Sequence, residues 1–300
     1  MQKLGPRLTI LVFALAISAA SALAQQAATA TSATHESSAR SDIENLIQQS
    51  GGDVAVAFRA LDGGQELLIH ENRPFEDPLS LKIPVMIELF AQVDAQQAKM
   101  SDGVPVRNLF RSAADSSAYT IDPDAGDSLI HEAGKVMTLH DLCVTMITTN
   151  SDIAANLLIE HLGIEAIRSR IHALGADGMV LATTFGDAKA AQRGVKNVTT
   201  PLALMTILLA LAENQVVSAD ASQQMVGLLA HSLLPGSLVG IASSPELAAN
   251  QKPSPTGDQH DAAIIFGARS FVLVTDIRGL SPQASAALVA HIAHLLAAAI

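Results

Sequence analysis

The sequence predicts an α+β fold, in which an antiparallel β-sheet is flanked by N- and C-terminal helices and packed on an inserted all-helical lobe. Two hairpin patterns lie near residues 54–70 and 261–278, and a long stretch of helical periodicity separates them. A helical pattern also precedes the first hairpin and follows the second. Strands so far apart in the chain can share one sheet only if the helical block between them is an insertion.

The first 24 residues have the order of a secretory signal peptide. Lys3 and Arg7 precede an apolar run that ends in "SALA". Ala22 and Ala24 supply the small residues that a signal peptidase needs, which favours cleavage after Ala24 over an uncleaved membrane anchor. The Ala/Ser/Thr-rich residues 25–40 indicate a flexible spacer. We therefore expect a secreted or periplasmic protein.

Charge and cysteine content exclude several classes of protein. After cleavage, 16 basic and 29 acidic residues remain, a net charge of −13 that disfavours nucleic-acid binding. No later stretch is long and apolar enough to predict a membrane span. Cys143 is the only cysteine, which excludes an intramolecular disulfide and suggests a small buried hydrophobe. No glycine-rich phosphate loop is present, and we expect no cofactor.

The sheet lobe is expected to comprise residues of about 41–76 and 240–300. Ser41 is a suitable N-cap for the first helix, with Glu44 three residues later. "DVAVAFRA" and "ELLIH" flank the turn "LDGG", and "DAAIIF" and "SFVLVTDI" flank the turn "GAR". The closing helix begins after Ser281, with Pro282 in its first turn. These elements predict two hairpins covered by two helices.

The helical lobe is expected to span residues of about 77–239. Apolar residues recur at three- and four-residue spacing in five segments: "IPVMIELFAQVDAQQ", "TLHDLCVTMITTN", "SDIAANLLIEHLG", "IEAIRSRIHALG" and "TPLALMTILLALAEN". Gly163 and Gly175 are expected to end two of these helices. Thr199 or Thr200 is expected to cap the helix that begins at Pro201.

Several of these segments, taken in order, resemble those of one enzyme family. "SLKIPVMIELFAQVD", "MITTNSDIAANLLIEHLG" and "NVTTPLALMTILLALAEN" are similar to segments of class A β-lactamases and penicillin-recognising serine hydrolases. The resemblance covers residues 41–300. It implies a β-lactamase-like domain with its active site between the sheet and the helical lobe. The chemistry of this family rests on three motifs, S-x-x-K, S-D-N and K-T-G.

The first motif keeps its lysine but not its nucleophile. Lys82 matches the motif's lysine, and Leu79 stands where the family has serine. Residues three apart on a helix lie about 60° apart around its axis, so both would face one cleft. Leucine has no nucleophilic atom. Ser80 is the alternative, a displaced nucleophile that requires the helix to start late or to slip by one residue.

The second motif is shifted by one residue. The match places Asn150 at the hydroxyl position and Asp152 at the amide position, with Ser151 between them. Asn150 can donate a hydrogen bond but cannot shuttle a proton as a hydroxyl does. The alternative is structural: Ser151 or Asp152 caps the following helix. Asn150 and Asp152 are the candidate partners for Lys82, because a buried ammonium requires a polar or charged partner.

The third motif and the hydrolytic acid of the family are also altered. Lys252 and Ser254 are the candidate ligand-binding residues near the edge strand, but prolines occupy positions 253 and 255. A proline at an oxyanion position offers no N–H donor. The segment "NQKPSPTGDQ" is therefore predicted to be a loop. The stretch "TTFGDAKAAQRGVKNVTTP" lacks the family's glutamate, and Asp187 is its only acid.

Histidines outside these motifs give weaker signals. His291 and His294 have a spacing that can hold a metal, but no acid or cysteine in their helix completes a site, and we expect a solvated helix face and no metal. His260 and Asp261 are adjacent on a predicted strand. Their side chains should therefore point to opposite faces of the sheet rather than act as an acid/base pair.

The residues favour a catalytically impaired or inactive homologue over an active enzyme. Its ligand would be a peptidoglycan-type fragment or a β-lactam, or its partner would be a protein. The alternatives are a serine hydrolase that uses Ser80 or Ser151 on β-lactams or D-amino-acid peptides, and a structural envelope protein with no ligand. Residues of such a site act as a unit, so the loss of several motifs together favours the first hypothesis.

Overall fold

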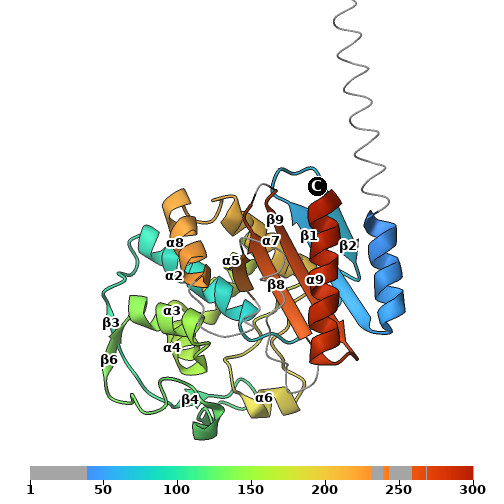
Figure 1. Cartoon of the computed structure of the whole chain (residues 1–300). Helices are drawn as coiled ribbons and strands as arrows, with labels where there is room; N and C mark the ends of the chain where they lie inside the picture. Colours follow the sequence, from blue (N-terminus) through green and yellow to red (C-terminus); the bar gives the residue numbers. More distant parts are fainter. Residues whose placement is uncertain (1–38, 231–238, 243–258, 268, 300) are drawn as a thin grey trace, which may run out of the picture.

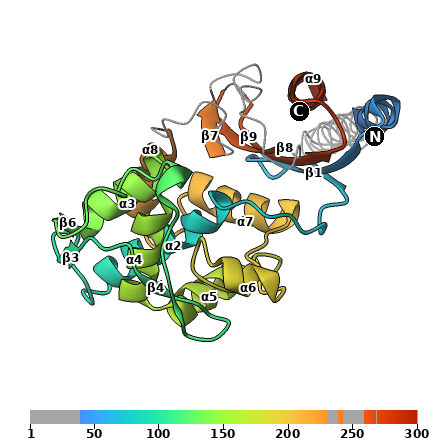
Figure 2. The same ribbon diagram turned by 90° about the horizontal axis from the view of Figure 1, so that it is seen from below.

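The computed structural model describes residues 39–230, 239–242, 259–267 and 269–299. The predicted signal peptide, most of the predicted spacer, and Lys252 and Ser254 lie outside the described residues. A β-sheet lies between two covering helices on one side and a lobe of helices on the other (Figures 1 and 2). The predicted α+β architecture is confirmed.

Five strands form the main sheet in the order β2-β1-β9-β8-β7. β1 (Asp53–Ala60) and β2 (Glu66–Ile69) form the first predicted hairpin, and β8 (Gln259–Ile265) and β9 (Phe271–Arg278) form the second. β1 pairs with β9 along its whole length, which joins the two hairpins. These four strands are antiparallel, whereas the edge strand β7 (Val239–Ala242) pairs with β8 in parallel.

The two faces of the sheet bury different cores. On β8, Ala263 and Ile265 belong to the core under the helix over residues 39–50 and α9 (Pro282–Ala299). Ala262 and Ile264 belong to the larger core shared with the helical lobe. This alternation is the two-residue period of a strand that is buried on both faces. Polar side chains on these strands therefore lie either toward the covering helices or toward the helical lobe.

The helical lobe contains all five predicted helices. α2, α3, α4, α5 and α7 span Ile83–Asp94, Leu139–Thr148, Asp152–Leu162, Ile164–Ala173 and Pro201–Ala212. α2 packs against α4, α5 and α8 and is at the centre of the lobe. Shorter elements, which the sequence did not predict, connect these helices: η1 (Ser80–Lys82), β3 (Gly103–Pro105), β4 (Phe110–Arg111), β5 (Ala118–Tyr119), η2 (Pro123–Ala125), β6 (Val136–Thr138) and α6 (Ala188–Gln192).

Helix boundaries follow the predicted capping residues in most cases. The hydroxyls of Thr200 and Ser281 accept hydrogen bonds from the first turns of α7 and α9. Ser41 is not an N-cap, because the first helix already includes residue 39. α8 (Ala219–Ala230) was not predicted. Two of its buried residues, Ala221 and Ser222, are small, so its apolar stripe is weak in the sequence.

α9 is the one helix, within the part of the chain that the structure describes, that is long and apolar enough to cross a membrane. The sequence had predicted no such segment. Length and composition alone are weak evidence, because core helices of domains meet the same criteria. Leu288, Val289 and Ile292 of α9 are buried in the core that the sheet contributes to, which is the packing of a helix within a domain.

Arg73, in the loop after β2, holds a buried carboxylate on the sheet. Its Nε donates to Oδ2 of Asp276 on β9 at 2.8 Å, and its Nη2 donates to the Asp276 backbone carbonyl at 2.6 Å. His260 and Arg278 also approach the Asp276 carboxylate, which is fully buried. Burial raises the pKa of Asp276, but His260, Arg73 and Arg278 outweigh it and hold the pKa below its usual value.

We predict that Arg73→Met lowers the free energy of unfolding by about 3 kcal/mol at pH 7, because the substitution leaves a buried carboxylate short of a partner. Arg59→Met is the control. It breaks an exposed 3.7 Å pair with Glu66 and should cost less than about 1 kcal/mol. Urea unfolding measures both. The Arg73 deficit should shrink as the pH falls through the lowered native pKa of Asp276, because the protonated carboxyl no longer needs a cationic partner. Equal losses in the two variants would contradict this assignment.

Candidate functional site

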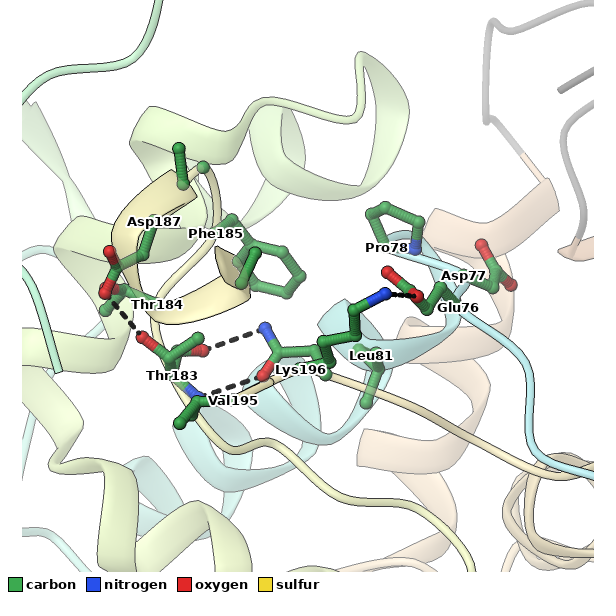
Figure 3. A pocket seen from close by; sticks show the side chains of 14 residues that line it. Glu76, Asp77, Pro78, Leu81, Thr183, Thr184, Phe185, Asp187, Val195 and Lys196 are labelled. Carbon is green, nitrogen blue, oxygen red and sulfur yellow. Dashed lines mark hydrogen bonds and ion pairs between the residues drawn. The ribbon is translucent and has the colours of Figure 1, made fainter. Parts of the chain in front are cut away.

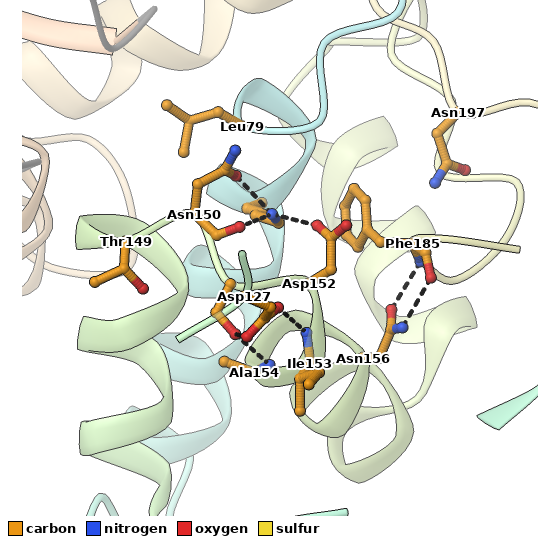
Figure 4. Close-up of polar contacts among 12 residues, drawn as sticks. Leu79, Asp127, Thr149, Asn150, Asp152, Ile153, Ala154, Asn156, Phe185 and Asn197 are labelled. Atoms are coloured by element: carbon orange, nitrogen blue, oxygen red, sulfur yellow. Dashed lines mark hydrogen bonds and ion pairs between the residues drawn. The ribbon is translucent and has the colours of Figure 1, made fainter. Parts of the chain in front are cut away.

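Lys82 lies at the junction of η1 and α2 and points into the interior between α2 and the loop that joins α3 to α4. Its side chain is fully buried. Nζ donates to the Asn150 carbonyl at 2.8 Å, to Asn150 Oδ1 at 2.6 Å and to Asp152 Oδ1 at 2.6 Å (Figure 4). An ammonium has three donors, and all three are used here.

Burial of this ammonium is expensive and is only partly offset. Desolvation lowers the pKa of Lys82, while the nearby carboxylates of Asp152, Asp127 and Asp77 act in the opposite direction. The ring of Phe185 lies 4.9 Å from Nζ, a cation–π distance. The charge pair that we suggested from the sequence, between Lys82 and Asp152, is therefore present in the structure.

Asn150 reaches Lys82 through an unusual backbone conformation. Its φ angle is +56°, in the left-handed region that asparagine adopts more readily than most residues. In this conformation the Asn150 carbonyl and the Asn150 side-chain oxygen both accept from Lys82 Nζ. The residue thus serves as an acceptor for Lys82 at the position where the resemblance suggested a hydroxyl.

Ser151 has a structural role in the same loop. Its Oγ accepts a hydrogen bond from the Ala154 N–H at 3.0 Å, which caps α4, and donates to Asp127 Oδ1 at 2.8 Å. The second Asp127 oxygen accepts from the Ile153 N–H at 3.0 Å. The alternative that Ser151 caps the following helix is therefore confirmed.

Leu79 and Ser80 are both buried. Leu79 has no hydroxyl, and the hydroxyl of Ser80 is not directed at Lys82. Leu79 is 3% exposed and Ser80 is not exposed at all. Ser80 Oγ donates to the carboxylate of Asp77, three residues earlier. Asp77 also accepts the backbone N–H groups of Leu79 at 3.1 Å and of Ser80 at 3.3 Å. Asp77 therefore caps the turn that leads into α2 and occupies the Ser80 hydroxyl.

Asp187 is committed to holding its own loop. It caps α6 through the Ala190 N–H and accepts from Ser112 Oγ and the Ala113 N–H, each at 2.8 Å. Burial raises its pKa, but these hydrogen bonds outweigh it and lower the pKa below the usual value. An acid with its oxygens so occupied is poorly suited to act as a general base.

His260 and Asp261 lie on opposite faces of β8, as predicted. The His260 ring stacks on Phe75 at 4.6 Å between centroids, and its Nδ1 lies 2.8 Å from Asp276 Oδ1, on the face toward the helical lobe. Asp261 pairs across the sheet with Thr275. Its carboxylate is buried, and burial raises its pKa well above the usual value. The two side chains do not form an acid/base pair.

His291 and His294 are exposed on α9. Among the described residues, no three His, Cys, Asp or Glu side chains come together in a group that could hold a metal.

A pocket of about 270 Å³ opens beside the Lys82 cluster (Figure 3). Its walls come from residues 76–81, which lead into α2, and from residues 183–197, which surround α6. Pro78, Leu81 and Phe185 give it an apolar lining, and Phe185 also contacts Lys82. At the pocket, Lys196 Nζ pairs with Glu76 Oε1 at 2.7 Å through side chains that are about half exposed.

The structure brings together three of the predicted site residues, Lys82, Asn150 and Asp152, and places Leu79 just before them along the chain. Sequence reasoning missed Asp77, Asp127 and Phe185. The position of Asp77, two and three residues before the N–H groups it accepts, is a capping pattern that could have been recognised in "DPLS". Asp127 and Phe185 come from distant loops and carry no local signal.

Comparisons with known proteins agree with this architecture. The model of the beta-lactamase enzyme family matches residues 38–300. A beta-lactamase from Rhodobacter capsulatus is 27% identical over 227 residues, which cover 75% of this chain and 72% of the relative. The crystal structure of a beta-lactamase from Sphaerobacter thermophilus has a TM-score of 0.65 at 22% identity and covers 88% of this chain and 95% of that chain.

A penicillin-binding structure is similar to the same extent. The L158E mutant of PBP-A, in an acyl-enzyme complex with penicillin G, has a TM-score of 0.66 at 16% identity and covers 87% of this chain and 95% of that chain. At such identities the solved structures establish the fold alone.

We predict that Asp152→Asn lowers the free energy of unfolding by about 3 kcal/mol at pH 7, because the Lys82 ammonium loses its charged partner while it remains buried. Urea unfolding at several pH values measures the loss. The deficit should shrink as the pH rises toward 10.5, the ordinary pKa of a lysine, above which Lys82 is neutral in every state.

Glu160→Gln is the matched control for this prediction. Its side chain is 33% exposed, as is that of Asp152, but its partner Arg107 is 49% exposed whereas Lys82 is buried. The control should lose less than about 1 kcal/mol. A loss at Asp152 no larger than at Glu160 would mean that Lys82 is not held by this pair.

Proposed function

The chain belongs to the beta-lactamase enzyme family, and we propose that it is a member that binds a ligand of this family's kind without forming an acyl-enzyme. The ligand class is a peptidoglycan-derived fragment or a β-lactam. We infer this ligand class from the family, because the L158E mutant of PBP-A, a structural relative, carries penicillin G as an acyl-enzyme. The predicted signal peptide supports a place in the cell envelope.

One observation carries this proposal: no hydroxyl faces the Lys82 ammonium from the helical turn before it. Leu79 is a hydrocarbon at that place, and the hydroxyl of Ser80 is buried and donates to Asp77. A nucleophile must present its oxygen to both a base and a substrate carbonyl. Lys82 is also unsuited to accept a proton, because its three donors are all engaged with acceptors.

The serine-hydrolase alternative has less support. Ser151 is 1% exposed, and its hydroxyl both accepts from Ala154 and donates to Asp127. Attack by Ser151 would first require the cap of α4 to break, and attack by Ser80 would first require its hydrogen bond to Asp77 to break. Each such loss would cost about 1 kcal/mol and would leave a buried partner short of a hydrogen bond.

The pocket beside Lys82 supports a binding role over a purely structural one. Its volume of about 270 Å³ fits a side chain or a small ring, and its wall combines apolar side chains with polar ones such as Thr183 and Thr184. The polar atoms of Asn197 in the wall are already satisfied by the backbone of residues 182 and 183. The exposed pair of Glu76 and Lys196 can meet the charged groups of a peptidoglycan fragment.

We predict that incubation with a fluorescent penicillin leaves the intact mass of the purified chain unchanged, because no free hydroxyl is available for acylation. Leu79→Ser alone should also form no turnover-competent acyl-enzyme, since Lys82 remains paired with Asp152. Intact-mass spectrometry and a chromogenic β-lactam measure the two outcomes. A stable adduct that peptide mapping places on Ser80 or Ser151 would support the serine-hydrolase alternative instead.

We predict that a soluble muramyl pentapeptide or penicillin G raises the thermal unfolding temperature. At ten times Kd the stabilisation is about 1.4 kcal/mol, or a few degrees for a chain of this size. Ala191→Trp, at an exposed position in the pocket wall, should abolish the shift by filling the pocket.

Ala173→Trp is the matched control, because Ala173 is an exposed helical alanine outside the pocket. The control should keep the full shift. If neither ligand shifts the unfolding temperature, the result would favour a structural envelope protein with no ligand. If Ala191→Trp keeps the shift, the ligand binds outside this pocket.

A further inference from the structure

A second pocket, of about 290 Å³, lies between α2, α3 and α8 and shares no residue with the Lys82 cluster. A thioether, an imidazole and a thiol line it together: Met100, His140 and Cys143. Phe90 and Leu228 supply apolar walls. We propose that these three side chains form a soft-metal site that binds one Cu(I) ion.

The backbone brings the three donors to one place. His140 and Cys143 lie three residues apart on α3, which puts them on the same face with about 5–6 Å between their Cβ atoms. Met100 lies beside the first turn of α3, because its backbone carbonyl accepts a hydrogen bond from the His140 N–H at 3.0 Å. The Asp102 carbonyl accepts the Leu139 N–H at 2.9 Å and fastens the same loop. The pocket is thus formed by α2, α3, α8 and the loop between α2 and β3.

His140 has a carboxylate neighbour of the kind that metal-binding histidines commonly have. Its Nδ1 lies 3.2 Å from Asp141 Oδ1, which leaves Nε2 as the nitrogen available to a metal. Metal-binding histidines commonly donate their other ring N–H to a carboxylate, which fixes the tautomer and raises the basicity of the ligand nitrogen. The His140 side chain is 59% exposed, so an ion can enter from solvent.

Cys143 forms the buried end of the site. The residue is 1% exposed, and burial raises the pKa of its thiol to about 12. No described hydrogen bond uses its sulfur. The thiol is therefore neutral in the free protein, and binding replaces its proton: Cys143–SH and Cu⁺ give Cys143–S–Cu and one H⁺ released to solvent. The oxidation state of copper and of sulfur is unchanged.

The donor set selects the ion. Thiolate and thioether sulfur are soft ligands that favour Cu(I), and imidazole suits copper as well. Ca²⁺ and Mg²⁺ require several oxygen ligands, which this pocket does not gather among the described residues. A structural zinc site would normally need four nitrogen or sulfur ligands of the Cys and His type. Cu(I), which accepts thioether, imidazole and thiolate ligands, matches all three side chains.

The test is an anaerobic competition of the purified chain with the Cu(I)–bicinchoninate complex, followed by its absorbance. We expect one equivalent of Cu(I) to be withdrawn, and X-ray absorption to show sulfur in its coordination shell. Cys143→Ser should abolish this binding. Met100→Leu, a near-isosteric change at a half-buried position, should weaken it at least about tenfold.

Met137→Leu is the matched control, because Met137 is a half-buried methionine outside the pocket. It should leave binding unchanged. No withdrawal of Cu(I), or full binding by folded Met100→Leu together with Cys143→Ser, would overturn the proposal. Loss of binding on His172→Gln alone would do the same, since it would assign the ion to an exposed histidine elsewhere. None of these outcomes depends on whether the pocket beside Lys82 binds a ligand.

Discussion

A buried ammonium with three donors to satisfy constrains the middle of this molecule. Lys82 is fully buried, and the core of the helical lobe is built largely from apolar side chains. Two of its acceptors come from a single residue, Asn150, whose left-handed backbone is required to present both oxygens. The third comes from Asp152 at the start of α4. The loop between α3 and α4 therefore has to take one shape, and Ser151 and Asp127 fix that shape from the other side.

Much of the fold could be predicted from the sequence because apolar periodicity is local information. The hairpins β1–β2 and β8–β9 and the helices α2, α3, α4, α5 and α7 all have strong patterns bounded by turn or capping residues. α8 was missed because Ala221 and Ser222 weaken its stripe. The parallel pairing of β7 with β8 depends on how distant segments meet, and no local pattern encodes it.

The candidate site was predictable only where a motif carried it. Lys82 and the acceptors Asn150 and Asp152 follow from aligning short segments and from the rule that a buried ammonium needs partners. The roles of Asp77 and Phe185 depend on tertiary contacts: Asp77 turns the Ser80 hydroxyl away, and Phe185 reaches Lys82 from a loop about a hundred residues further along the chain. Composition and periodicity contain no information about contacts between segments that are distant in the sequence. The members of a buried polar network can therefore be identified only from the structure.

The partners of Lys82 make this lysine hard to replace. Replacement of a buried charge is tolerated when all of its partners change together, whereas removal of one member leaves the others unpaired. Lys82, Asp152 and Asn150 would have to be exchanged together to keep every buried partner satisfied. The Leu79 side chain, by contrast, packs as a hydrocarbon, and only the backbone of this residue is hydrogen-bonded, through its N–H to Asp77 and its carbonyl to the Lys82 N–H. A substitution at position 79 therefore disturbs no polar side-chain network, whereas a substitution of Lys82 alone leaves the acceptors on Asn150 and Asp152 without their donor.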